Sequence, residues 1–82
     1  METYSASLLA SDFILGDDGI YVGTVPASTH GLGQSVHVQK ALQRNSDITF
    51  DNIILSYRVE PNGDIKIHMD EPAILRIVIA AD

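Results

Sequence analysis

Hydrophobic and polar residues alternate with a period of two along much of the chain. The clearest run is Ile65–Asp70, in which aliphatic and polar side chains take turns, as in a strand with one buried face. Directly before it, Asn62 and Gly63 form the pair that favours the positive φ angles of a hairpin turn. We therefore predict that Asn52–Glu60 pairs antiparallel with Ile65–Asp70 through a turn at Asn62 and Gly63.

Other short runs of β-branched and aliphatic residues predict further strands between turn signals. Ser35–Arg44 is ambiguous, because its alternation at Val36 and Val38 gives way to good helix formers from Lys40 onward, and we interpret it as a strand. A turn at Asn45–Asp47 would then lead into a second hairpin. The additional predicted strands are Tyr4–Leu9, Phe13–Leu15, Ile20–Val25, Ser35–Arg44, Ile48–Phe50 and Ala73–Ala80. About six to eight short strands with frequent turns predict an all-β fold, a small antiparallel β-sandwich or barrel.

The last predicted strand, Ala73–Ala80, is almost entirely aliphatic, which is typical of a strand covered on both faces. A chain of 82 residues without cysteine is marginal as an isolated domain. We therefore expect one face to meet the core and a second subunit to cover the other. The candidate interface residues are Ile74, Val78 and Ala80 on one face and Leu75, Ile77 and Ile79 on the other.

The composition of the chain indicates how many domains it forms and which classes of partner it does not bind. We predict a single domain over residues 1–82, since no linker, repeat or low-complexity tract interrupts it. The formal net charge of −6, with five scattered basic residues, opposes binding to a nucleic-acid backbone. There is neither an apolar run long enough to span a membrane nor a basic start typical of a secretory signal, so we expect neither insertion nor export.

The three histidines are the main candidates for chemistry. His30 precedes a glycine, and we expect its imidazole to bond a turn carbonyl and hold the loop. His37 and His68 fall on the polar faces of alternating strands. If those strands were neighbours, the two imidazoles and Asp70 could bind a metal ion, but solvent-exposed histidines on a sheet are commoner. We accordingly predict no metal site and no other cofactor.

No pattern of residues indicates catalysis. The serines lack a G-x-S-x-G elbow, and the glycines of the chain lack the lysine and helix of a phosphate-binding loop. The acidic pairs Asp17–Asp18 and Asp70–Glu71 fall at turns and do not have the spacing of a calcium loop, so we interpret them as solvated turn residues. We therefore predict that the protein is not an enzyme.

A sharp corner lies within Val25–Val38, which reads V-P-A-S-T-H-G-L-G-Q-S-V-H-V. Here His30, Gly31, Leu32 and Gly33 place a leucine between two permissive glycines. This arrangement predicts a tight reversal of the chain that returns Leu32 to the core.

The residues around this corner carry a resemblance to a known family. Tyr21–Gln39, a strand followed by T-H-G-L-G and V-H-V-Q, resembles a module of tailed-phage virion structural proteins. The N-G-D-I-K-I run at Asn62–Ile67 and the R-I-V-I run at Arg76–Ile79 are also similar, so the resemblance covers most of the chain from Phe13 onward. The family often continues as V-Q-V-Y-D, whereas Gln39 is followed here by K-A-L-Q.

The resemblance implies a small β-sandwich, usually trimeric, in a fibre, tail appendage or head decoration of the virion. Its partners would be further copies of the chain and other capsid or tail proteins, and its corner and hairpin-turn residues would be structural. An alternative function is a carbohydrate- or receptor-binding domain that recognises a host surface glycan, in which Tyr21 and Tyr57 would stack on a sugar.

Overall fold

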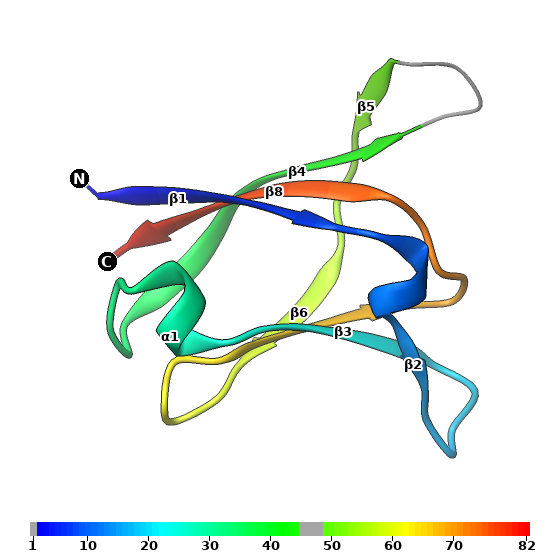
Figure 1. The fold of residues 1–82 in the computed structure, drawn as a ribbon, viewed down its shortest axis with the longest axis horizontal. Coiled ribbons are helices and arrows are strands. Elements are labelled where there is room, and N and C mark those ends of the chain that lie inside the picture. Colours follow the sequence, from blue (N-terminus) through cyan, green and yellow to red (C-terminus); the bar gives the residue numbers. More distant parts are fainter. Residues whose placement is uncertain (1, 45–48) are drawn as a thin grey trace.

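The computed structural model describes residues 2–44 and 49–82, which form two antiparallel sheets of four strands (Figure 1). The first sheet has the order β1 (Thr3–Leu8), β8 (Leu75–Ala81), β4 (Val36–Arg44) and β5 (Phe50–Asn52). The second has the order β2 (Ile14–Leu15), β3 (Tyr21–Val25), β7 (Ile65–Met69) and β6 (Ser56–Val59). A 3-10 turn at Ala10–Asp12 and the one-turn helix α1 (Ala27–His30) complete the described elements. The predicted all-β, sandwich-like fold is confirmed.

The chain builds the two sheets by passing between them after each hairpin. The hairpins β2–β3 and β6–β7 lie in the second sheet, and β4–β5 lies in the first. The final strand, β8, returns to the first sheet and pairs with both β1 and β4. The first and last strands of the chain therefore pair with each other in one sheet, with β1 at its edge and β8 beside it (Figure 1).

The core lies between the sheets and is dominated by alternating aliphatic residues of β7 and β8. The largest fully buried side chains are Ile65, Ile67, Leu75, Ile77 and Ile79. The face of β8 that holds Leu75, Ile77 and Ile79 is thus the core of the chain itself, which corrects the suggestion that these three contribute to an oligomer interface. Of the other face, Ala80 is also buried, whereas Ile74 and Val78 are half-buried.

A β-bulge in β4 explains its ambiguous sequence pattern. The register against β8 shifts between Val38 and Lys40, so that Val38 lies opposite Ile79 while Ala41 lies opposite Ile77. The extra residue changes the alternation from one half of the strand to the other. Val36 and Val38 before the bulge and Ala41 after it therefore all face the core, and the segment is one strand rather than a strand followed by a helix.

The predicted hairpin with its turn at Asn62 and Gly63 is confirmed, but its first strand is shorter than the predicted Asn52–Glu60, because only β6 (Ser56–Val59) pairs with β7. Only β6 pairs with β7, and Asn52 belongs to β5, opposite Leu42. The chain crosses between the sheets at residues 53–55, where Ile54 is fully exposed. The N–H of Ile53 still donates to the carbonyl oxygen of Ala41 in β4, and pairing with β7 begins only at Ser56, so the alternation in this segment did not indicate one continuous pairing partner. Ile48 and the predicted turn at 45–47 lie outside the described residues.

Two neighbouring positions of β8 should respond differently to truncation. We expect Ile77→Ala to lower the free energy of unfolding by about 2–5 kcal/mol, because it opens a cavity in the enclosed core. Val78→Ala, on the half-buried opposite face, should cost about 1 kcal/mol or less in the monomer. Urea unfolding followed by circular dichroism measures both, and equal losses would contradict the assignment of the two faces.

Candidate functional site

The corner after β3 contains a short helix that the sequence pattern did not predict. Pro26 precedes α1, and the N–H of Gly31 donates to the carbonyl oxygen of Ala27 over 2.9 Å. Gly31 closes the helix with φ 64°, a left-handed conformation that glycine adopts without strain. The corner is therefore one helical turn followed by a reversal, and four residues are too few for a helical period to be recognised in the sequence.

His30 is the single buried polar or charged side chain among the described residues, and both of its ring nitrogens have main-chain partners. Its Nδ1 accepts the N–H of Leu32 at 3.0 Å, and its Nε2 lies 2.7 Å from the carbonyl oxygen of Gly63. An amide N–H can only donate and a carbonyl can only accept, so a neutral imidazole with its proton on Nε2 satisfies both contacts. His30 thus bonds a turn carbonyl, as its position suggested, but the carbonyl belongs to a different turn.

The turn that His30 reaches is the β6–β7 turn, so the two motifs singled out in the sequence lie against each other (Figure 1). At Gly63, which has φ 96°, an added Cβ would overlap the carbonyl oxygen of Gly33 and lie 3.2 Å from the Cβ of Ala27. Gly63 is therefore required for its backbone conformation and for the close approach of the corner. We call the contact between residues 26–33 and 62–64 the corner lock.

Asp64 contributes a second bond to the corner lock. Its Oδ1 accepts the N–H of Ala27 at 2.7 Å, which satisfies a donor at the start of α1, and its own N–H donates to Oδ1 of Asn62 at 3.0 Å. The bond from Ala27 is the main cause that lowers the pKa of Asp64 below its ordinary value of 3.8. Sequence analysis missed this residue, because its partner lies far away along the chain.

The remaining predicted corner residues support the same contact. Leu32 is partly buried and packs against the core, while Gly31 and Gly33 both have positive φ angles. The corner lock therefore fixes where β3 ends and β4 begins relative to the β6–β7 hairpin. Its polar groups are paired with each other, so the arrangement serves to hold the fold.

His37 and His68 do not come together. His37 lies on β4 in the first sheet, where Nδ1 is 2.6 Å from Oδ1 of Asp82, and His68 lies on β7 in the second sheet, opposite Val22. Within residues 2–44 and 49–82 no group of three or more metal-ligating side chains was found. The alternative of a His37–His68–Asp70 site therefore does not fit the structure, because the two histidines belong to different sheets.

Tyr21 and Tyr57, the candidates for sugar stacking, are both on the core side of the second sheet. They lie opposite Met69 and Ile67 of β7, whose side chains point toward the first sheet. Tyr21 packs against the core, and Tyr57 is 37% exposed at the edge of the sheet. The two rings therefore do not form a flat exposed platform of the kind that stacks on a sugar.

In comparisons with known proteins, no family model, no curated protein and no solved structure matched the chain. No helix in the described part of the chain is long and apolar enough to cross a membrane.

Substitution at two glycines should separate the corner lock from simple backbone strain. Gly63→Ala should lower the free energy of unfolding by about 3 kcal/mol or more, because it adds a clash with a main-chain carbonyl to the cost of a positive φ. Gly19→Ala is the matched control, since Gly19 has φ 80° with no atom near the added Cβ. It should cost only about 1–2 kcal/mol. Chemical denaturation of both variants checks this, and similar losses would argue against a close approach at Gly63.

Asp64 should make the protein less stable in acid. Folding lowers its pKa, so the unfolded chain binds the proton more readily, and the stabilisation is complete above pH 3.8. It is lost as the pH falls through the folded-state pKa. We expect Asp64→Asn to reduce this loss, and Asp64→Ala to weaken the fold at neutral pH as well, because alanine cannot accept the Ala27 N–H. Unfolding curves at several pH values test this, and an unchanged pH profile in the asparagine variant would contradict it.

Proposed function

We propose that the chain is a non-enzymatic structural module of a phage virion that forms a homo-oligomer and docks on, or projects from, the particle. The corner lock is the observation that carries this proposal. The motif on which the resemblance to virion proteins rests, His30–Gly33, has its histidine engaged entirely with main-chain groups. It is used to hold a β fold rigidly, as expected of a structural module.

Exposed apolar side chains support self-association or docking. Leu9 directly follows β1 and is 56% exposed, and Ile14 and Leu15, the two residues of β2, are 75% and 56% exposed. Because β2 is a two-residue strand at the edge of the second sheet, no neighbouring strand covers its outer side. Several large apolar groups on so small a surface are typical of a protein that associates with a partner.

The size of the core points in the same direction. The buried hydrophobic cluster consists of few residues, and no disulfide strengthens it. Small domains of this kind commonly gain stability from association. A trimer is the assembly that the resemblance favours, and the virion is then the location.

The mass of the purified assembly tests the oligomer directly. We expect light scattering coupled to gel filtration to give a multiple of the monomer mass, and the folded protein to sediment together with capsid or tail components when mixed with them. A folded monomer at all accessible concentrations, with no binding to those components, would overturn the proposal.

A further inference from the structure

The outer face of the first sheet concentrates positive charge in an otherwise acidic chain. In β4, Lys40, Leu42 and Arg44 share one face of the strand. The register places Arg76 opposite Leu42, and Phe50 opposite Arg44. This surface, the basic face, consists of Lys40, Leu42, Arg44, Phe50, Arg76 and Val78. It holds three of the five basic residues of the chain.

Acidic residues are absent from the described strand positions on this side of the sheet. The neighbouring outward positions of β1, opposite β8, are Thr3, Ser5 and Ser7. Asp82, just beyond β8, is paired with His37. Neither Lys40 nor Arg76 has a carboxylate within ion-pair distance among the described residues, whereas Arg58 of the second sheet lies 3.9 Å from Glu60.

The basic face also has an apolar centre. Leu42, Phe50 and Val78 are half-buried, and the guanidinium of Arg76 lies 4.4 Å above the ring centroid of Phe50. This cation–π contact holds the Arg76 side chain across the surface. Charged groups around a partly exposed apolar centre are typical of a protein interface, where a polar rim surrounds the apolar contact.

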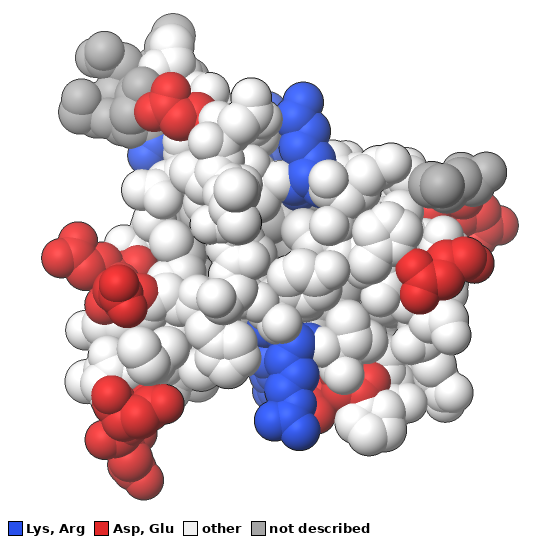
Figure 2. All heavy atoms as spheres, turned by 180° about the vertical axis from the view of Figure 1, so that it is seen from behind, with Lys and Arg blue, Asp and Glu red and all other residues white. Residues whose placement is uncertain are grey.

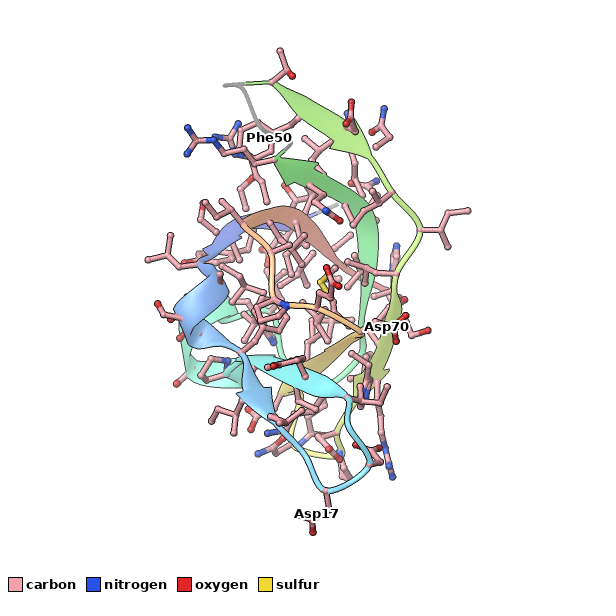
Figure 3. The ribbon with its side chains drawn as sticks, turned by 90° about the vertical axis from the view of Figure 1, so that its right-hand side faces the viewer. Asp17, Phe50 and Asp70 are labelled. Carbon is pink, nitrogen blue, oxygen red and sulfur yellow. The ribbon has the colours of Figure 1, made fainter. Side chains whose placement is uncertain are left out.

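Opposite charge gathers at another part of the molecule. The β2–β3 turn carries Asp17 and Asp18, and Asp70 and Glu71 follow β7, whose last paired residue, Met69, lies opposite Tyr21 at the start of β3. These four exposed carboxylates form the acidic end. Figure 2 shows acidic side chains along the edge where this hairpin projects, and Figure 3 places Asp17 at one end of the molecule, Phe50 near the other end and Asp70 between them.

The acidic end contains a hollow that suits a long basic side chain. Its volume is about 280 Å³. The two carboxylates of its lining are Asp18 and Asp70, its apolar residues are Ile20 and Met69, and Ser56 and His68 complete it. The apolar residues match the aliphatic stem of a lysine or arginine, and the carboxylates match its charged head. The hollow and the basic face are thus complementary in charge and in polarity.

We propose that the basic face of one copy binds the acidic end of a second copy, head to tail. This inference rests on the proposed oligomeric function and names the surfaces that would mediate it. Because the two surfaces are different, the contact is heterologous, and repeated contacts close into a ring when the rotation between copies allows it.

Charge reversal with a swap tests the contact. The first variant is K40E/R76E, and the second is D17K/D70K; Asp18 stays unchanged because its Oδ1 accepts the N–H of Ile20 at 3.0 Å. We expect each variant to dissociate, with the dissociation constant raised about tenfold or more, because like charges then face each other. Combining both sets in one chain should restore the assembly.

Raising the salt from about 50 to about 500 mM should weaken the wild-type assembly, because salt screens the attraction between the two surfaces.

A control separates this contact from a change in net charge or folding. Arg58→Glu makes the same change in net charge as K40E alone, at an exposed residue of the second sheet outside both surfaces, and should leave the mass unchanged. Circular dichroism shows whether each variant folds, and K40E alone repeats the test if loss of the Arg76–Phe50 contact disturbs the fold.

The outcomes distinguish this inference from the proposed function. A wild-type oligomer whose mass is unaffected by either reversal and by salt overturns the head-to-tail contact and leaves the oligomeric module standing. Reversals that abolish binding to another virion protein while the mass stays constant also overturn it, because the basic face then serves a different partner. A wild-type monomer under all conditions removes both the contact and the oligomer.

Discussion

The imidazole of His30 lies between two main-chain groups, the N–H of Leu32 and the carbonyl of Gly63, and this contact holds the corner between β3 and β4 against the β6–β7 turn. Without it, the polar groups of the corner would be buried and unpaired, which is costly in a low-dielectric environment. Asp64 adds a charged acceptor at the start of α1. Together these bonds connect the chain near residue 30 to the β6–β7 turn, in addition to the packing of the aliphatic core.

The first sheet shows how one irregularity can give the two faces of a sheet different properties. The bulge between Val38 and Lys40 lets β4 direct Val38 inward before it and Ala41 inward after it. The same shift places Lys40 and Leu42 outward, beside Val78 and Arg76 of β8. The core and the charged outer surface are therefore set by a single change of register, and neither could alter without the other.

The function that we propose follows from this division of roles. The buried polar contacts hold the fold, and the exposed residues remain for recognition. Apolar groups at Ile14 and Leu15 lie next to the acidic β2–β3 turn, while the basic face surrounds apolar residues of its own. A structural module that assembles through such surfaces needs complementary charge and shape rather than a catalytic pocket.

The local pattern was enough to predict an all-β fold, the β6–β7 turn at Asn62 and Gly63, and the strand nature of most segments, because alternation and turn propensity act between near neighbours. It could not show that β5 and β6 belong to different sheets, because that choice depends on which strands compete for the same partner. The tertiary structure alone brought His30 to Gly63 and separated His37 from His68. The reason is physical: contacts between residues distant in the chain depend on the packing of whole sheets, and no short stretch of sequence encodes that packing by itself.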